Sequence, residues 1–190
     1  PKLPVHTVRL RCVDTDGNIK MLEPLSYIDV AFHELGGVVD KDYQLGAPIY
    51  QTNLTCDLEA GQYIIDDYQN NVNAGTASFQ IQGVFPVTIG KKRYTFEINP
   101  LPLKGGITLV DTNVQYDGSY KYPNWMFTEE SNNKLVLYTD YNVTYKNNLY
   151  PGEATIEVKG LRNYVGEMSA TFIIEKARMT SARYTVALPE

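Results

Sequence analysis

The amino-acid sequence predicts an all-β protein made of two tandem antiparallel β-sandwich domains, and three observations carry this prediction. Residues 68–83 recur as residues 145–160, 77 positions further on, with six of the sixteen positions identical. Ordinary composition would give about one identity, so the chain contains an internal repeat. The 15 tyrosines, against one tryptophan and six phenylalanines, favour strands, where a ring lies half-buried with its hydroxyl in water. Short apolar stretches alternate with polar residues and show no crossover helix, which indicates antiparallel sheets packed face to face.

The overall composition excludes some classes of partner. With 43% hydrophobic and 21% charged residues, the 190-residue chain can form two modest cores under a polar surface. The net charge is −5 and no window concentrates Lys and Arg, which argues against nucleic acid as a partner. No run of 18 apolar residues occurs, so we expect no membrane span in this chain.

The repeat sets the expected domain boundaries, and each domain is a repeat core with an additional piece at its outer end. The first domain spans residues 1–98 (core 23–98, hairpin 1–22) and the second spans residues 99–190 (core 99–174, strand 175–190). The end pieces are either fragments of neighbouring repeats or strands that complete the sheets of these two domains. We favour the first interpretation, in which the chain is part of a longer array.

The N-terminal piece is expected to form a hairpin. Residues 5–13 alternate between apolar and polar side chains, Asp-Gly marks a turn within residues 14–18, and residues 19–22 form the return strand. The oxygen-bearing side chains at alternate turn positions also resemble the opening of a calcium loop. No Glu stands at the twelfth position of such a loop, so a plain turn is the better interpretation.

The first strand of each repeat core is expected at residues 27–32 and 103–110, in the register set by the Pro-Leu pairs at residues 24–25 and 100–101. Residues 26–35 also have near-helical spacing of apolar side chains. A Gly-Gly pair in the second copy argues against a helix common to both copies, because glycine is a poor helix former. We therefore expect strands here.

The rest of each copy follows the same order of turns and short strands. We expect turns at residues 36–37, 40–43 and 116–120, and strands at residues 49–50, 62–68, 77–81 and 94–98 in the first copy and 125–127, 140–145, 154–158 and 170–174 in the second.

Six residues of the repeated stretch are assigned structural roles. The Asn-Asn pairs tolerate a positive φ and form turns, some glycines permit backbone angles closed to other residues, and others end a strand. The residues in question are Asn71, Asn148, Gly75, Gly152, Gly83 and Gly160.

The motifs of the second copy resemble a known repeat family. They comprise Tyr-Asp-Gly at residues 116–118, Asp-Tyr-Asn-Val-Thr-Tyr-Lys-Asn-Asn at 140–148, Pro-Gly-Glu-Ala-Thr-Ile-Glu-Val-Lys-Gly at 151–160 and Asn-Tyr-Val-Gly at 163–166. This series is similar to the tandem Ig-like β-repeats of large bacterial surface proteins. The first copy keeps Asn-Ala-Gly-Thr-Ala at residues 73–77, but it has Val-Asp-Lys at residues 39–41 in place of Tyr-Asp-Gly and Pro-Val-Thr-Ile-Gly at residues 86–90 in place of Asn-Tyr-x-Gly.

The resemblance covers about 150 residues and implies two Ig-like domains of an exported bacterial protein, located outside the cell or at the cell wall. It implies a spacer or adhesion segment, and it carries no active site that could be transferred to this chain. A glycan or a cell-surface protein is the kind of partner that it implies, and we expect a monomer.

The sequence offers no convergent catalytic group, and we expect neither an enzyme nor a cofactor. His6 and His33 are the only histidines, and neither has a Cys or a second His at metal-ligand spacing. The adjacent acids at residues 66–67 and 129–130 would point to opposite faces of a strand, which suits solvated side chains better than acid–base pairs. No metal site is predicted.

An aromatic group is the strongest candidate for ligand binding. Tyr120, Tyr122 and Trp125 lie within six residues and could form a platform for the CH faces of a sugar or for a protein partner. In the alternative, Trp125 and Phe127 fill the core and the tyrosines close its edge. A carbohydrate-binding module is therefore the second hypothesis for the function of this chain.

The two cysteines leave a choice open. Cys12 and Cys56 both lie in the first copy and have no counterparts in the second. A disulfide between them suits an exported protein, and two free thiols fit the sequence equally well.

Overall fold

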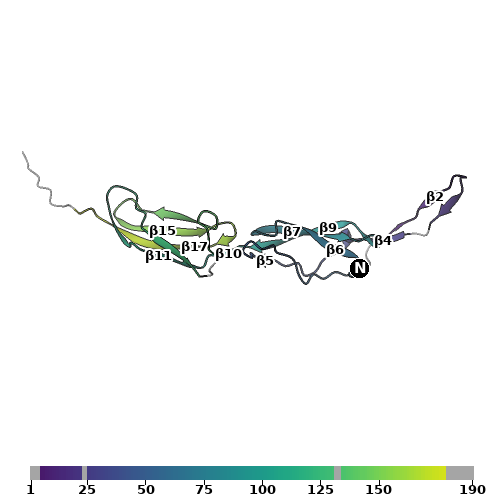
Figure 1. Cartoon of the computed structure of the whole chain (residues 1–190), viewed down its shortest axis with the longest axis horizontal. Coiled ribbons are helices and arrows are strands. Elements are labelled where there is room, and N and C mark those ends of the chain that lie inside the picture. Colours follow the sequence, from purple (N-terminus) through teal and green to yellow (C-terminus); the bar gives the residue numbers. More distant parts are fainter. Residues whose placement is uncertain (1–4, 23–24, 131–133, 179–190) are drawn as a thin grey trace, which may run out of the picture. The chain divides into compact units, whose positions relative to one another are not determined.

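The computed structural model describes residues 5–22, 25–130 and 134–178, and these residues form an all-β protein of several sheets (Figure 1). The chain divides into two compact units, Pro1–Pro100 (unit 1) and Leu101–Glu190 (unit 2). The sequence had placed this division two residues earlier, after residue 98. The strand expected within residues 175–190 at the C-terminus falls largely outside the described residues, which end at residue 178.

The main sheet of unit 1 has the strand order β5-β9-β7-β6. The strands β6 (Tyr63–Gln69), β7 (Gly75–Gly83) and β9 (Lys91–Asn99) are antiparallel neighbours. The short strand β5 (Lys41–Asp42) pairs with the end of β9 in parallel. The turn expected at residues 40–43 is wrong, because residues 41–42 form an edge strand beside β9 although they show no apolar alternation of their own.

The core of unit 1 lies on one face of this sheet. Alternate side chains of β7 and β9 point into it, and Leu35 and Ile49 from the connecting segments pack against them. The buried members of the cluster are Leu35, Ile49, Ala77, Phe79, Ile81, Phe96 and Ile98. The period of two in residues 77–81 therefore marks the buried face of a central strand, as alternation in a one-sided sheet requires.

A second sheet of unit 1 has the order β1-β4-β8, formed by β1 (Val5–Val8), β4 (Leu25–Asp29) and β8 (Thr88–Ile89). The expected strand at residues 27–32 is only partly correct, since β4 ends at Asp29 and a 3₁₀ turn, η1 (Val30–Phe32), follows. The Asp29 side chain accepts a hydrogen bond from the Ala31 N–H at 2.9 Å, which caps the turn and ends the strand.

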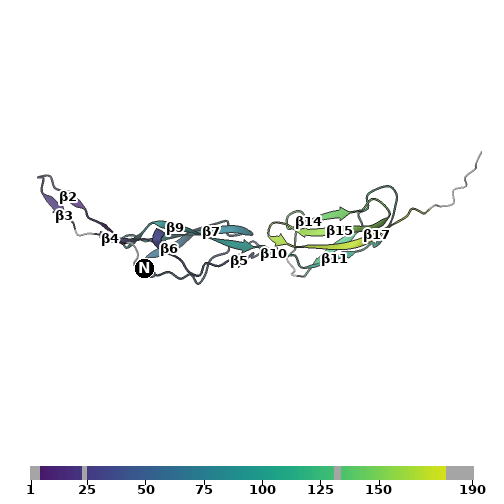
Figure 2. The same ribbon diagram turned by 180° about the vertical axis from the view of Figure 1, so that it is seen from behind.

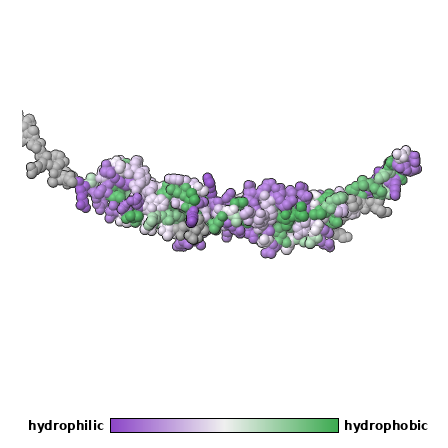
Figure 3. Space-filling model, in the orientation of Figure 1, coloured by the Kyte–Doolittle hydropathy of each residue, from purple (hydrophilic) through white to green (hydrophobic). Residues whose placement is uncertain are grey.

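The N-terminal hairpin is shorter than the sequence suggested. β1 pairs with β4, and only β2 (Arg11–Val13) and β3 (Ile19–Met21) pair with each other. The turn between them is held by Asp14, whose carboxylate accepts hydrogen bonds from the Asp16 and Asn18 N–H groups and from the Asn18 amide. These bonds hold the pKa of Asp14 below its usual value. Apolar side chains on the hairpin face solvent, as Figure 3 shows in green.

The main sheet of unit 2 has the order β12-β17-β15-β14, and Figure 2 shows β14 beside β15. Its strands are β12 (Asn113–Gln115), β14 (Tyr141–Lys146), β15 (Gly152–Gly160) and β17 (Glu167–Glu175). Ala154, Phe172 and Ile174 form the centre of its core, and half-buried side chains surround them, namely Leu109, Val114, Tyr116 and Tyr145.

Two further two-stranded sheets lie in the described part of unit 2. β10 (Leu101–Pro102) runs parallel to β16 (Tyr164–Val165), and β11 (Gly105–Leu109) runs antiparallel to β13 (Trp125–Glu129). Between the matching segments of unit 1, a single antiparallel bridge joins Gly36 and Thr55.

The two units share a pairing pattern that corrects the repeat register near its start. Ile28 pairs with Thr88 in unit 1, and Leu101 pairs with Tyr164 in unit 2. Thr88 and Tyr164 are 76 residues apart, whereas Ile28 and Leu101 are 73 apart. Leu101 therefore takes the pairing position that Ile28 has in unit 1. The Pro-Leu pairs had instead suggested Leu25 as its equivalent. The expected antiparallel order also needs correction, because β4–β8, β5–β9, β10–β16 and β12–β17 are all parallel pairs.

Candidate ligand-binding site

The loop that contains the Asn-Asn pair has the same construction in both units. In unit 1 it joins β6 to β7, and Asn70 takes the left-handed conformation with φ of 54°. The next residue, Asn71, exchanges two hydrogen bonds with Ile49. Its Nδ2 donates to the Ile49 carbonyl at 3.0 Å, and its carbonyl accepts from the Ile49 N–H at 2.7 Å. The side chain of Asn71 thus acts as a backbone-like partner for a segment 22 residues earlier.

Unit 2 repeats this arrangement residue for residue. Asn147 has φ of 56°, and Asn148 donates from Nδ2 to the Lys121 carbonyl at 2.9 Å while accepting from the Lys121 N–H at 2.7 Å. We call this pair of bonds the Asn latch. The sequence predicted a turn at these positions, and the structure shows that the first Asn bends the chain while the second holds a distant segment. In unit 2 that segment carries Tyr120 and Tyr122.

The turn before the latched segment is held by an ion pair. Lys121 Nζ lies 2.5 Å from Asp117 Oδ1, and Asp117 also accepts from the Ser119 N–H at 2.9 Å. The hydrogen bond from Lys121 is the largest cause that holds the pKa of Asp117 far below its usual value. Residues 116–120 form the turn expected from the sequence, and this turn fixes the backbone of Tyr120.

The latch of unit 2 places three tyrosines around a pocket of about 500 Å³. Tyr120 is 59% exposed and Tyr150 is 68% exposed, whereas Tyr145 is half-buried. The other lining residues come from the loop and the start of β15, and they are Asn147, Asn148, Leu149, Pro151, Gly152 and Glu153. The pocket therefore combines exposed rings with amide and carboxylate groups, which is a common composition for a small-ligand site.

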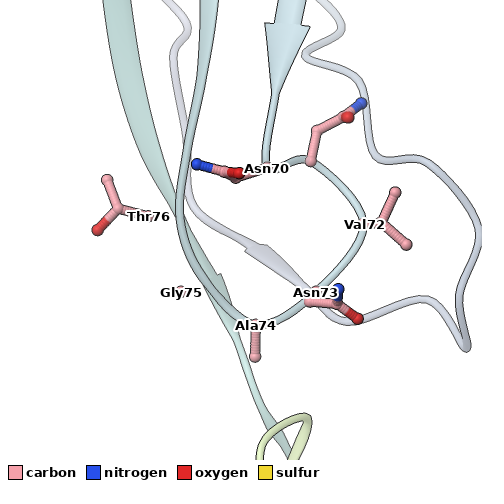
Figure 4. A pocket seen from close by; sticks show the side chains of 7 residues that line it. Asn70, Val72, Asn73, Ala74, Gly75 and Thr76 are labelled. Atoms are coloured by element: carbon pink, nitrogen blue, oxygen red, sulfur yellow. The ribbon is translucent and has the colours of Figure 1, made fainter.

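The matching loop of unit 1 forms a pocket of about 470 Å³ whose lining differs in chemistry (Figure 4). It is lined by residues 70–76, all of them in the described part of the chain, and no aromatic side chain is among them. Asn73 stands where unit 2 has Tyr150, and Thr76 stands where unit 2 has Glu153. The two pockets thus share their backbone and differ in their side chains.

Tyr145 is the residue around which the predicted aromatic group gathers. Its ring lies 5.0 Å from that of Tyr122 at an interplanar angle of 87°. Burial raises the pKa of its hydroxyl, and the neighbouring Trp125 side chain opposes this rise. Tyr120 and Tyr145 line the same pocket. Tyr145 lies in the strand expected at residues 140–145, and its distance in sequence from residues 120–125 gives no indication that it lies beside them.

Trp125 lies between the two positions that the sequence allows for it, an exposed platform and the core. Trp125 and Phe127 lie on β13 and are both half-buried, and Phe127 packs at 5.2 Å against Tyr141. Tyr120 and Tyr122 are exposed. Tyr122 and Tyr145 are perpendicular, so they do not form one flat platform. The exposed rings that line the pocket are those of Tyr120 and Tyr150.

The glycines assigned structural roles lie at the ends of matching strands. Gly75 and Gly152 begin β7 and β15 with φ of 124° and 139°, a region that glycine favours. Gly83 and Gly160 end the same strands. A Cβ atom on Gly83 would lie 2.6 Å from the Ile89 nitrogen, and one on Gly160 would lie 2.7 Å from the Tyr164 oxygen. These two positions need glycine because another strand passes against them.

A second group of polar side chains lies in unit 1. Cys12 is exposed and Cys56 is half-buried, and the structure holds both as free thiols. Cys56 lies instead near His33 and Asp57, and the ligand atoms of these three residues lie within 4.8 Å of one another. Sequence reasoning found no cysteine at metal-ligand spacing from a histidine, because these residues are brought together only by folding.

Comparisons with family models, with curated proteins and with solved structures find no match to this chain. The described residues contain no helix of the length and apolar character needed to cross a membrane.

Proposed function

We propose that this chain is a non-catalytic tandem of two Ig-like β-sandwich domains from an exported bacterial surface protein, and that it acts as a spacer or adhesion segment under tension. The observation that carries the proposal is the parallel pairing of an early strand with the last main-sheet strand in each unit. The resemblance of the repeat motifs supports the Ig-like domain type and the location at the cell surface.

The parallel pair of unit 2 is the clearer case. β12 runs beside the C-terminal half of β17, with Asn113 opposite Ile173 and Gln115 opposite Glu175. Its ends are closed by hydrogen bonds of 2.9 Å from the Ile173 N–H to the Thr112 carbonyl and from the Tyr116 N–H to the Glu175 carbonyl.

The direction of these strands decides how the unit responds to tension. A pull on the two ends of the unit draws β12 from its N-terminal end and β17 from its C-terminal end. In a parallel pair these forces are opposite and lie along the strands, so all the hydrogen bonds between them must break together. An antiparallel hairpin pulled from its open end would lose its bonds one at a time. The pairing therefore suits a segment that holds something at a distance from a surface.

Unit 1 repeats this geometry with fewer residues. β4 pairs with β8 through Ile28 and Asp29, and β5 pairs with the end of β9 through Lys41 and Asp42. Both pairs are parallel, and both join an early strand to a late one. Two successive units with this pattern would share a tensile load in series, which is the arrangement expected of a stalk made of repeats.

Pulling the chain from two alternative points tests this proposal. With Cys12 and Cys56 replaced by Ser, handles are attached through Asp111→Cys and Lys176→Cys, so that tension crosses the β12–β17 pair. In the control, Ser119→Cys replaces Asp111→Cys, and the tension enters after β12. We expect a clearly higher rupture force for the first pair, with a chain extension of about 200 Å at roughly 3.3–3.6 Å per residue. Equal rupture forces would contradict the proposed role of the parallel pair.

The aromatic pocket of unit 2 favours a second function, the binding of a carbohydrate. Exposed Tyr120 and Tyr150 offer ring faces to the CH groups of a sugar, and Asn147 and Glu153 offer polar groups for its hydroxyls. The volume of about 500 Å³ suits one or two sugar rings. A spacer and a glycan-binding segment are compatible in one chain, because the pocket lies on a loop and the parallel strands lie elsewhere.

Replacing Tyr150 by Ala tests this second function. Tyr150 is 68% exposed, so its removal should change the free energy of unfolding by less than about 0.5 kcal/mol. On a glycan array we expect saturable binding by the parent chain and its loss in Tyr150→Ala. The matched control is Asn73→Ala at the same position of the unit 1 loop, which should leave binding unchanged. Absence of binding by the parent chain, or equal binding by all three chains, would rule the pocket out as a glycan site.

A further inference from the structure

We propose that His33, Cys56 and Asp57 form a binding site for a divalent transition-metal ion, with Zn²⁺ as the best fit. His33 Nδ1 lies 2.6 Å from Asp57 Oδ1, and Cys56 Sγ lies 3.8 Å from the same oxygen. All three ligand atoms lie within 4.8 Å of one another, and this is the one group of three such residues in the described part of the chain. The site is independent of the spacer and glycan-binding functions.

Hydrogen bonds to the backbone of His33 and packing around its ring hold this residue in place. His33 ends η1, and its N–H donates to the Val30 carbonyl at 3.0 Å. Its carbonyl accepts from Lys92 Nζ at 2.9 Å and from the Tyr94 hydroxyl at 2.7 Å. The ring is 1% exposed, so its position is set by packing as well. A ligand that is already fixed loses little conformational entropy when a metal ion binds.

The other two ligands are positioned by the bridge between Gly36 and Thr55. Gly36 and Thr55 exchange backbone hydrogen bonds of 2.9 and 3.0 Å, directly before Cys56. Leu58, which is 7% exposed, anchors the chain on the other side of Asp57. Two segments 23 residues apart in sequence are therefore held side by side, and the ligands come from both.

The chemistry of the three ligands points to zinc. A thiolate, an imidazole and a carboxylate bind Zn²⁺ at about 2.0–2.3 Å in tetrahedral sites. Ca²⁺ and Mg²⁺ prefer oxygen ligands, so the thiol and the imidazole select against them. The thiolate and the carboxylate together balance the charge of the ion. Three protein ligands leave a fourth position for water, and the Asp57 side chain, which is 58% exposed, provides access from solvent.

Metal binding at this site would involve the protons of two ligands, the His33 imidazole and the Cys56 thiol. His33 Nδ1 and Asp57 Oδ1 share a hydrogen bond, and Nε2 is buried with no hydrogen-bond partner among the described residues. An ion bound at Nδ1 replaces any proton on that atom, so the proton of the neutral ring then lies on Nε2. The Cys56 thiol releases its proton to solvent as the sulfur–metal bond forms. Because a metal ligand must be deprotonated, binding releases protons and is favoured as the pH rises.

Titration of the reduced 190-residue chain with Co²⁺ tests the site, because a cobalt–thiolate bond produces a charge-transfer band in the near ultraviolet. We expect one ion per chain, displacement of Co²⁺ by Zn²⁺, and loss of the band in Cys56→Ser. Asp57→Asn should weaken binding by at least about tenfold, because it removes an anionic ligand and even the loss of a residue that only supports a ligand costs about that much. Asp57 is exposed, so this variant should remain folded even if changes at the buried His33 do not.

Cys12→Ser is the matched control, since Cys12 is an exposed thiol on the β2–β3 hairpin. It should keep the band, the stoichiometry and the affinity of the parent chain. Failure of the parent chain to bind Co²⁺ or Zn²⁺ would overturn the proposal. The same conclusion would follow if Cys12→Ser removed the band while Cys56→Ser kept it, or if Asp57→Asn bound as tightly as the parent chain.

Discussion

Replacement of Phe79 by Ala is expected to destabilise unit 1 by about 3–5 kcal/mol, the range measured for fully buried phenylalanines. Phe79 is 0% exposed at the centre of β7. Its ring stacks on Tyr68 and Tyr94, with centroids 5.3 and 5.7 Å away, and it packs on Phe96 at 6.3 Å. Its removal would leave a cavity among three other rings, which are carried by the two neighbouring strands β6 and β9, so the site cannot collapse without moving the sheet.

Equilibrium unfolding in urea measures this effect and also tests the independence of the two units. Unit 2 has its own core around Ala154, Phe172 and Ile174. In Phe79→Ala we expect the unit 1 transition to move to lower urea concentration while the unit 2 transition stays in place. Phe172→Ala, in which a side chain that is 1% exposed is truncated, should produce the reciprocal result. A shift of both transitions in either variant would show that the units unfold as one.

The buried face of each central strand could be predicted from the sequence. Residues 77, 79 and 81 and residues 154, 156 and 158 are apolar with polar residues between them, and all six are 0% exposed. Alternation is a local signal, and it is reliable where one face of a sheet packs on a core and the other meets water.

The short edge strands could not be predicted, because they have no sequence pattern of their own and form only where a partner strand lies beside them. Lys41 and Asp42 have no apolar pattern, and they become β5 only because Ile98 and Asn99 lie beside them. The three-residue error in the repeat register has the same origin. The Pro-Leu pairs looked equivalent in sequence, yet backbone pairing makes Ile28 the equivalent of Leu101.

The candidate sites depend even more on distant contacts. The sequence predicted Tyr120 as a ligand-binding residue but not Tyr145 or Tyr150, and it is the Asn latch that brings Tyr120 to the pocket that they line. His33 and Cys56 lie 23 residues apart, and no motif connects them. In both cases the spacing of the residues in the sequence gives no indication of a site. The residues come together only when the loops close in the folded chain.

Replacement of Gly160 by Ala is expected to destabilise unit 2 by about 3 kcal/mol or more, at the upper end of the cost of overpacking. The added Cβ would lie 2.7 Å from the Tyr164 oxygen and 2.9 Å from the Val165 nitrogen. These are backbone atoms of β16, which is held to the first strand of the unit by hydrogen bonds from the Leu101 and Leu103 N–H groups at 2.9 and 2.8 Å. Relief of the overlap would therefore displace β10 as well as β16.

Gly106→Ala provides the control for this prediction within the same unit. A Cβ at Gly106 would meet no atom within 4 Å, and its φ lies outside the left-handed region. Ala in a strand restricts the unfolded chain more than Gly does, so this variant should be neutral or stabilised by up to about 1 kcal/mol. Urea unfolding of both variants would measure the difference. If Gly160→Ala proved as stable as Gly106→Ala, the close passage of β16 would not be the reason that glycine occupies this position, and the repeated glycine at position 83 would need another explanation too.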